Sequence, residues 1–391
     1  MLEFQFHVPT QFIFGKDVHK QLGSWVVDHG YRRAMIICGK SFAEKSGLMQ
    51  GIVKDLEAHG IEHVMLKGVR PNPEVTMVRQ GIELMRQEGC DIILAIGGGS
   101  VIDSAKAIAL GTHYEGDVWE LYETKKPVAW EVVPIATILT IPAAGSEAST
   151  SSVLNNDEQG RKTSYYSELI KSRVAFMNPE LTYSLPPYQT AAGVVDMYSH
   201  ILERYFSAGP ATLVSDSIAL GLLRTLRTEG PRAVDDPQNY EVRANVMWIS
   251  TLAHNDICGL GRPGDWASHA LEHELSAFNP NITHGAGLAV IFPAWMRYVY
   301  RSAPERFATY GREVFGLATT GDPLDDARAA IDATQQFFLS LGMPARLSAF
   351  NITENDIESF IPTLRANKGE TFGTLMPLSL DDARLIYRLA L

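Results

Sequence analysis

Between Arg33 and Met177 the chain alternates between short apolar runs and longer amphipathic stretches. The short runs predict strands over Ala34–Cys38, His63–Leu66, Asp91–Ile96, Val132–Ile138 and Val174–Met177. The longer stretches carry apolar residues three or four positions apart, which predicts helices over Gly47–His59, Val75–Glu88 and Val101–Leu110. Such alternation is typical of a parallel sheet with helices on its faces. We therefore expect an α/β domain with a Rossmann-like parallel sheet here.

The pattern changes at Leu185-Pro186-Pro187, after which no strand is predicted. Helical spacing, interrupted by glycine and proline, extends over Thr190–Ser207, Ala211–Glu229, Tyr240–Cys258, Trp266–Phe278, Ala286–Tyr300, Asp325–Leu341 and Leu380–Leu391. We place the domain boundary after Pro186. The prediction is an α/β domain over residues 1–186 and an all-α domain over residues 187–391.

Charge and cysteine content narrow the class of protein. The 391 residues include 34 lysines and arginines against 45 aspartates and glutamates, a formal net charge of −11. Nucleic-acid binding depends on basic residues that displace phosphate counterions, so we expect no nucleic-acid partner. Cys38, Cys90 and Cys258 form no CxxC motif, and their odd number argues against a disulfide framework.

The sequence also predicts the compartment. The first residues lack a basic segment, and Glu3, His7 and Pro9 interrupt any apolar core of a secretory signal. No run approaches the roughly 18 apolar residues that a membrane-spanning helix needs. We expect a cytoplasmic protein without a membrane segment.

A glycine-rich turn follows the predicted strand that ends at Ile96. Gly97, Gly98, Gly99 and Ser100 lead from this strand into the predicted helix at Val101. Glycines allow a bulky anion to approach the backbone, and the N-terminus of the following helix presents free N–H groups to it. A pyrophosphate fits this pattern. Ile102 breaks the standard G-x-G-x-x-G spacing, and a turn that needs glycine for geometry alone is the alternative.

Acidic and imidazole side chains recur at helical spacing in the second half. Asp196 and His200 are four residues apart, as are His269 and His273, and His284 follows before a glycine. Residues four apart share one face of a helix, and a carboxylate with several imidazoles suits a divalent transition metal. With 11 histidines in the chain, chance spacing of core or surface residues is the alternative.

The segment from His269 to His273 also spells H-x-x-E-H, the inverted zinc-protease pattern. In such a hydrolase His269 and His273 bind zinc and Glu272 activates water. That alternative leaves the Gly97–Ser100 turn without a function.

These segments resemble the iron-containing (group III) alcohol dehydrogenases, in particular the butanol dehydrogenase branch. The resemblance extends nearly from end to end and rests on GGGSVIDSAK (Gly97–Lys106), LTIPAAGSEAS (Leu139–Ser149), LPP followed by GVVDMYSH (Leu185–His200), YEVRANVMW (Tyr240–Trp248), GDWASHALEHELSA (Gly264–Ala277) and THGAGLA (Thr283–Ala289). It implies a dinucleotide-binding α/β domain and an α-helical metal-binding domain, as in dehydroquinate synthase, with the active site in the cleft between them.

The resemblance assigns roles residue by residue. The implied metal ligands are Asp196, His200, His269 and His284, and these four belong to the catalytic site. His273 corresponds to a histidine beside the nicotinamide and substrate, and we expect it to relay a proton during catalysis. This assignment contradicts the protease pattern, in which His273 binds metal.

The resemblance also implies the cofactor contacts. The residues expected to bind the pyrophosphate are Gly97, Gly98, Gly99 and Ser100, and those expected to line the rest of the groove are Asp103, Thr140, Lys162 and Leu181. NAD-preferring relatives carry an aspartate after the first strand, where this chain has Gly39, Lys40 and Ser41. Without that carboxylate, and with a lysine available for a 2′-phosphate, we expect NADP(H) to be preferred over NAD(H).

The implied reaction is a metal-polarised hydride transfer between NAD(P)(H) and a short- to medium-chain aliphatic alcohol or aldehyde. Three nitrogens and a carboxylate suit Fe²⁺, Zn²⁺, Ni²⁺ or Co²⁺, and the family favours Fe²⁺. We expect apolar residues to surround the substrate, namely Val194, Val195, Met197, Trp266 and Leu271. A cyclase related to dehydroquinate synthase is an alternative, but its carboxylated substrate needs basic groups instead.

We also expect a homodimer. The β-rich segment Glu3–Phe14 is suited to pairing across chains through an exposed strand edge.

Overall fold

The computed structural model of the protein describes residues 1–39 and 47–391, which form two compact units. One unit comprises His7–Ser184; the other comprises Leu185–Leu391 together with Met1–Phe6. The domain roles predicted for residues 1–186 and 187–391 stay predictions. Within the described residues no helix has the length and apolar character needed to cross a membrane.

The His7–Ser184 unit is built on a six-stranded sheet of parallel strands in the order β1-β8-β5-β4-β2-β3. The strands are β1 (Gln11–Phe14), β2 (Arg33–Gly39), β3 (Glu62–Val69), β4 (Ile92–Gly97), β5 (Ile135–Leu139) and β8 (Val174–Met177). Strands β4, β5 and β8 are buried along their whole length, which explains their continuous apolar sequences. The predicted parallel sheet is confirmed.

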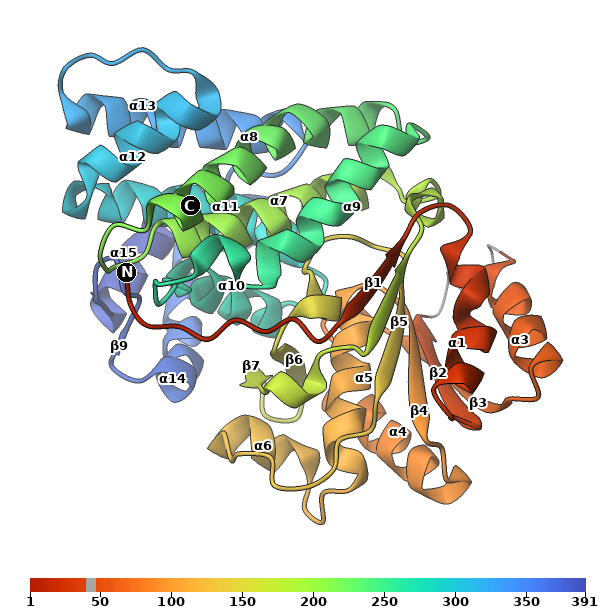
Figure 1. Cartoon of the computed structure of the whole chain (residues 1–391). Helices are drawn as coiled ribbons and strands as arrows, with labels where there is room; N and C mark the ends of the chain where they lie inside the picture. Colours follow the sequence, from red (N-terminus) through yellow and green to blue (C-terminus); the bar gives the residue numbers. More distant parts are fainter. Residues whose placement is uncertain (40–46) are drawn as a thin grey trace. The chain divides into compact units, whose positions relative to one another are not determined.

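Helices cover both faces of this sheet (Figure 1). They are α1 (Leu22–Asp28), α3 (Leu48–Ala58), α4 (Val75–Glu88), α5 (Gly99–Thr112) and α6 (Val118–Thr124). Helices α1 and α3 share one core with the sheet, to which β2 contributes Ala34, Ile36 and Cys38. Alternate residues of β2 therefore face opposite sides of the sheet.

A separate antiparallel hairpin joins β6 (Ser151–Asn156) to β7 (Arg161–Tyr166). The sequence analysis does not predict it, because both strands are rich in serine, threonine, asparagine and charged residues. Buried Lys106 connects α5 to the start of this hairpin, since its Nζ donates hydrogen bonds to the Ser149 and Ser151 carbonyl oxygens at 2.9 and 2.7 Å.

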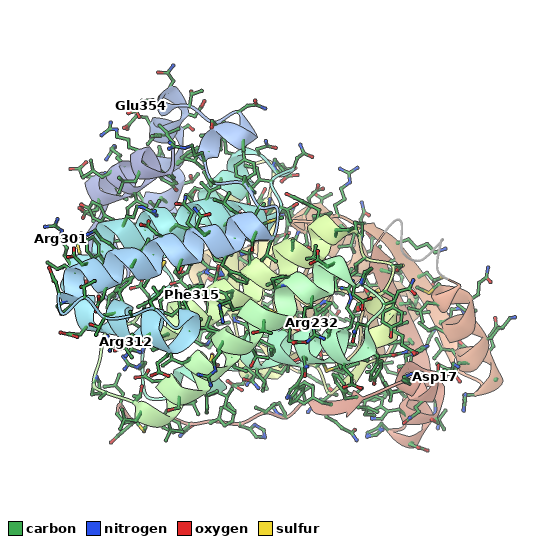
Figure 2. The ribbon with its side chains drawn as sticks, turned by 90° about the horizontal axis from the view of Figure 1, so that it is seen from above. Asp17, Arg232, Arg301, Arg312, Phe315 and Glu354 are labelled. Carbon is green, nitrogen blue, oxygen red and sulfur yellow. The ribbon has the colours of Figure 1, made fainter. Side chains whose placement is uncertain are left out.

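The Leu185–Leu391 part of the second unit is mainly helical. Its helices are α7 (Pro187–Tyr205), α8 (Leu213–Asp235), α9 (Tyr240–His254), α10 (Ala267–Phe278), α11 (His284–Val299), α12 (Pro304–Tyr310), α13 (Pro323–Ser340), α14 (Ile357–Lys368) and α15 (Leu380–Ala390). Charged side chains such as Arg301, Arg312 and Glu354 lie on the outside (Figure 2). Two short strands, β9 (Thr371–Phe372) and β10 (Leu378–Ser379), pair antiparallel, so this part is not purely helical as predicted.

Helices α7 and α11 form the centre of this unit. All residues of α7 from Thr190 to Tyr205 are buried, as are those of α11 from Gly285 to Met296. A helix that is buried all round is enclosed by other elements instead of covering a surface. The polar side chains of α7 therefore face the protein interior.

Candidate metal centre and glycine-rich turn

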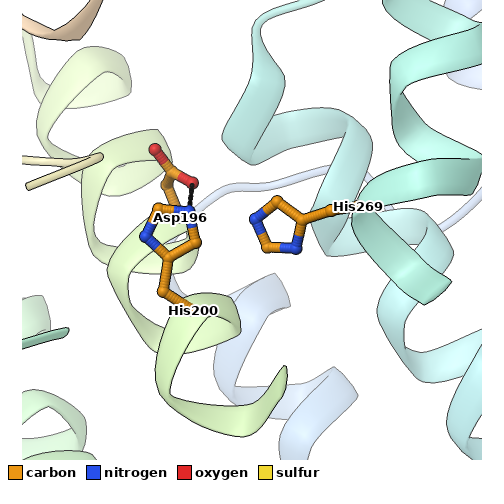
Figure 3. A group of neighbouring side chains, drawn as sticks. All are labelled: Asp196, His200 and His269. Atoms are coloured by element: carbon orange, nitrogen blue, oxygen red, sulfur yellow. Dashed lines mark ion pairs between the residues drawn. The ribbon is translucent and has the colours of Figure 1, made fainter. Parts of the chain in front are cut away.

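Helix α7 presents Asp196 and His200 on one face. The two residues are one turn apart and each is only 5% exposed. The Nε2 atom of His200 lies 3.6 Å from Oδ1 of Asp196. Figure 3 shows both side chains beside His269, whose ring extends toward them from α10. The potential ligand atoms of these three residues lie within 4.8 Å of one another.

The fourth predicted ligand, His284, is the first residue of α11. Its Nε2 atom lies 3.7 Å from the same Oδ1 atom of Asp196. The structure therefore brings together all four residues to which the sequence analysis assigned the metal. Asp196 is the common neighbour of His200 and His284.

The electrostatics of this group favour a cation. Burial lowers the pKa of His269 to about 3 and lowers the pKa of His200 far below its ordinary value, so both rings are neutral near pH 7. Within the described residues, Nε2 of His269 has no hydrogen-bond partner although it is buried. Neutral imidazole nitrogens and a carboxylate oxygen are suitable ligands for a divalent transition metal. The residues present thus fit such an ion.

The predicted proton relay, His273, adjoins this group. It is half-buried, and its ring centroid lies 5.6 Å from that of His284 and 6.5 Å from that of His269. It belongs to α10, one turn after His269. The structure brings it beside two of the four candidate ligands.

Glu203 and Glu272 are part of the same cluster. Glu203 is fully buried, and its Oε1 atom lies 3.0 Å from Nδ1 of His269. The sequence analysis missed this residue, although it lies four and seven positions beyond Ser199 and Asp196 on α7 and next to the ligand face. Fully buried Glu272 contacts the His284 ring and the Ser276 hydroxyl. Its carboxylate therefore contacts these two side chains inside the core, whereas the hydrolase alternative requires it to face a water molecule.

The apolar residues expected around a substrate lie elsewhere. The side chains of Val194, Val195, Met197 and Leu271 are fully buried in the core of the helical unit, so that expectation is wrong for these four. Half-buried Trp266 is different, because its ring packs edge-on against His200 and His269 at 6.0 and 5.3 Å between centroids.

The glycine-rich turn joins β4 to α5 in the other unit. Gly97 ends β4, Gly98 is the N-cap of α5, and Gly99 and Ser100 begin the helix. A Cβ atom on Gly97 would lie 2.5 Å from Val101, and one on Gly98 would lie 2.8 Å from Ile141. The packing therefore requires small residues at both positions, besides any need to admit a phosphate.

The topology of the sheet supports a nucleotide site at this turn. From β2 the chain continues to β3 on one side and then to β4 on the other, so the strand order reverses between β2 and β4. In open parallel sheets, ligands bind at such a reversal, at the carboxyl ends of the strands. Gly39 ends β2 and Gly97 ends β4 at that edge, and Thr140 donates a backbone hydrogen bond to Gly97 O at 3.0 Å.

The remaining predicted cofactor contacts are more scattered. The Asp103 carboxylate accepts hydrogen bonds from Ser146 Oγ at 2.6 Å and Val153 N at 3.1 Å, which tie α5 to the following segments. Lys162 donates from Nζ to Asn72 Oδ1 at 3.0 Å, and Leu181 is half-buried in a short 3₁₀ turn. Lys40 and Ser41 lie outside the described residues.

Comparison with known proteins identifies the family. A family model described as iron-containing alcohol dehydrogenase matches residues 9–179, and its C-terminal counterpart matches residues 190–390. The chain belongs to the iron-containing alcohol dehydrogenase family. As a member it is an oxidoreductase, and the cyclase and hydrolase alternatives are set aside.

Relatives from several bacteria support this assignment to the iron-containing alcohol dehydrogenases. NADH-dependent butanol dehydrogenase A of Clostridium acetobutylicum is 37% identical over 99% of both chains. The NADPH-dependent aldehyde reductase of Escherichia coli is 33% identical over 100% of both. The crystal structure of NADH-dependent butanol dehydrogenase A from Thermotoga maritima superposes with a TM-score of 0.96 at 36% identity, covering 100% of this chain and 99% of that one. The resemblance to the butanol dehydrogenase branch is confirmed.

The contact between α7 and α11 leads to a prediction about Gly285. A Cβ atom at this position would lie 2.0 Å from the Ala192 carbonyl oxygen, which is backbone and cannot rotate away. We expect Gly285→Ala to push α11 from α7, to separate His284 from Asp196, and to cost about 1–3 kcal/mol or more of stability. Thermal unfolding and the metal content of the purified protein measure the two effects.

Gly221→Ala is the matched control. Gly221 lies within α8, and no atom lies within 4 Å of the position of its missing Cβ. We expect this variant to keep its metal content and to gain up to about 1 kcal/mol of stability. Equal unfolding temperatures and equal metal contents in the two variants would contradict the claim that the backbone contact at Gly285 positions His284.

Proposed function

We propose that the protein interconverts short- to medium-chain aliphatic alcohols and aldehydes with NAD(P)(H), using one divalent metal held by Asp196, His200, His269 and His284. The observation that carries the proposal is the convergence of these four donors, among them the buried Nε2 of His269, which has no hydrogen-bond partner in the described part of the chain. The names of the relatives, butanol dehydrogenase and aldehyde reductase, support the substrate class.

Each part of the site has a distinct task in this proposal. A divalent ion supplies Lewis acidity, and the nicotinamide cofactor exchanges the hydride. Asp196 and the three histidines hold the ion, with Asp196, His200 and His269 buried and His284 partly exposed. The His273 ring passes the alcohol proton to solvent and returns it in the reductive direction, which its half-exposed position permits. The first turn of α5 binds the cofactor pyrophosphate.

We further propose Fe²⁺ as the metal and NADP(H) as the preferred cofactor. The family description favours iron over Zn²⁺, Ni²⁺ or Co²⁺. The relatives include both NADH- and NADPH-dependent enzymes, so the preference rests on Gly39, Lys40 and Ser41 in this sequence. Cys38, Cys90 and Cys258 are buried and form no disulfide, which favours a cytoplasmic location.

Elemental analysis of purified variants, with NADPH oxidation by a panel of aldehydes, tests the ligand assignment. We expect His269→Ala and Asp196→Ala each to lose the metal and the activity together, because each removes a donor from the buried group. His273→Ala should keep the metal and lose about a hundredfold or more in turnover, the range of general acid–base catalysis.

Circular dichroism and thermal unfolding establish that each of these variants is folded. Full metal content in folded His269→Ala or Asp196→Ala would refute the ligand set. Loss of metal from His273→Ala would make His273 a ligand and remove it from the proton relay.

Lys40→Asp tests the cofactor preference. A carboxylate after β2 repels the 2′-phosphate of NADP and bonds to ribose hydroxyls, so we expect KM for NADPH to rise more than KM for NADH. Steady-state kinetics with both cofactors measures the ratio, with Lys54→Asp on α3 as a charge-matched control. An equal change for both cofactors would overturn the assignment of Lys40.

We also propose a homodimer formed along the N-terminal segment. Strand β1 pairs with β8 on one side only within the described residues, and nearby Phe4 and Phe6 are 49% and 42% exposed. An edge strand that follows exposed apolar side chains in the sequence favours pairing with a second copy.

Sedimentation velocity tests this association. We expect the Phe4→Ser, Phe6→Ser double variant to shift toward monomer, while Leu389→Ser, which changes a residue that is 52% exposed on α15, sediments like the unmodified protein. A double variant that stays fully dimeric would exclude this segment as the interface.

A further inference from the structure

Two of the candidate ligand histidines share an arrangement that the third lacks. In each of the two, Nδ1 faces a glutamate that is 0% exposed, Glu203 for His269 and Glu272 for His284. In His200, by contrast, Nδ1 has no hydrogen-bond partner among the described residues. The His200 ring is instead stacked between His254 and His269, with centroids 4.2 and 4.7 Å away.

The two carboxylates select the tautomer of the rings they contact. Oε1 of Glu203 also accepts the backbone N–H of His269 at 3.0 Å, so it acts as an acceptor and Nδ1 of the ring is the donor. A neutral imidazole with its proton on Nδ1 carries its lone pair on Nε2. The lone pair of His269 therefore lies on Nε2, which has no hydrogen-bond partner among the described residues. The lone pair of His284 also lies on Nε2, which is 3.7 Å from Oδ1 of Asp196.

The glutamates also connect the helices that carry the ligands. Glu203 belongs to α7 and reaches His269 on α10, whereas Glu272 belongs to α10 and reaches His284 on α11. The ligand-bearing helices are thus linked in sequence by two buried carboxylate–imidazole contacts. Both contacts lie within the helical unit.

The surroundings of the two glutamates differ in one respect. Oε2 of Glu203 accepts the Trp266 backbone N–H at 2.7 Å, so this residue also caps the start of α10. Glu272 lies within α10 itself, where the Ser276 hydroxyl donates to its Oε1 atom. Space for Glu272 comes from Gly287, where a Cβ atom would lie 2.7 Å from Oε1. A substitution of Glu272 therefore keeps the hydrogen bond from Trp266 N to Glu203 that caps the start of α10.

We propose that Glu203 and Glu272 are positioning residues that set the affinity of the site for its divalent ion by fixing the tautomer and orientation of His269 and His284. This inference rests on the proposed ligand set. Carboxylates behind ligating histidines typically change metal affinity by 10- to 100-fold when they are removed.

The experiment is a titration of metal-free protein with Zn²⁺ in competition with a chromogenic chelator. Glu272→Ala should bind Zn²⁺ about 10- to 100-fold more weakly. Glu272→Gln should lose less, about fivefold, because its amide oxygen still accepts from Nδ1 but the hydrogen bond is no longer charge-assisted. Titration with Co²⁺ adds a readout of geometry, since the visible absorption bands should change in Glu272→Ala.

The chain offers a matched control on the same helix. Glu274 is 2% exposed, and its carboxylate accepts a hydrogen bond from Asn367 on α14 at 3.1 Å. Glu274→Gln should bind Zn²⁺ with unchanged affinity and keep the Co²⁺ spectrum. Glu203→Gln should lower both Zn²⁺ affinity and thermal stability, because an amide nitrogen replaces an oxygen that caps α10.

The outcomes separate this inference from the proposed function. The ligand set stands if the unmodified protein binds Zn²⁺ and His284→Ala does not. The positioning role is overturned if, in addition, Glu272→Ala and Glu272→Gln both bind Zn²⁺ as tightly as the unmodified protein. If the unmodified protein binds no Zn²⁺, the ligand set and the positioning role are both refuted. Should Glu272→Ala not fold, the comparison of Glu272→Gln with Glu274→Gln decides: equal affinities overturn the role.

Discussion

The close contact of α7 and α11 is the constraint on which the candidate metal centre depends. The carbonyl oxygen of Ala192 occupies the space that any side chain at Gly285 would need. Ala192 precedes Asp196 by one helical turn, and Gly285 follows His284 directly. The distance between the two helix backbones thus determines the distance between two candidate ligands. Interiors packed to crystal-like density leave no room for this spacing to relax.

Burial has opposite effects on the ligand histidines and on the carboxylate of Glu203 beside them. It removes protons from His200 and His269, which frees their lone pairs, and it makes the negative charge of carboxylates costly. It raises the pKa of Glu203 to about 7 even though backbone N–H groups of His269 and Trp266 donate to it. A divalent cation compensates both tendencies, since it uses the lone pairs and offsets the negative charge.

Much of the fold follows from local sequence, because buried parallel strands have continuous apolar runs. The strands around Ala34–Cys38 and Asp91–Ile96 were predictable for this reason. The β6–β7 hairpin was not, since its polar strands resemble a loop. The spacing of Glu203 from Asp196 placed it near the ligand face, but its partner His269 lies 66 positions away, and only tertiary structure brings the two together.

The apolar residues that were expected to surround the substrate show another limit of sequence patterns. Apolar residues beside the ligands, such as Val194 and Met197, were expected to face a substrate, but α7 is enclosed on all sides and they belong to the core. Hydrophobicity cannot distinguish these two environments. The ligand spacing was more informative, since residues four apart on a helix share a face whatever surrounds it.

All four candidate ligands and both supporting glutamates belong to the Leu185–Leu391 segment, whereas the glycine-rich turn belongs to the unit formed by His7–Ser184. Each unit has its own hydrophobic core. The candidate ion ligands and the turn predicted to bind the dinucleotide thus belong to separately cored pieces of the polypeptide.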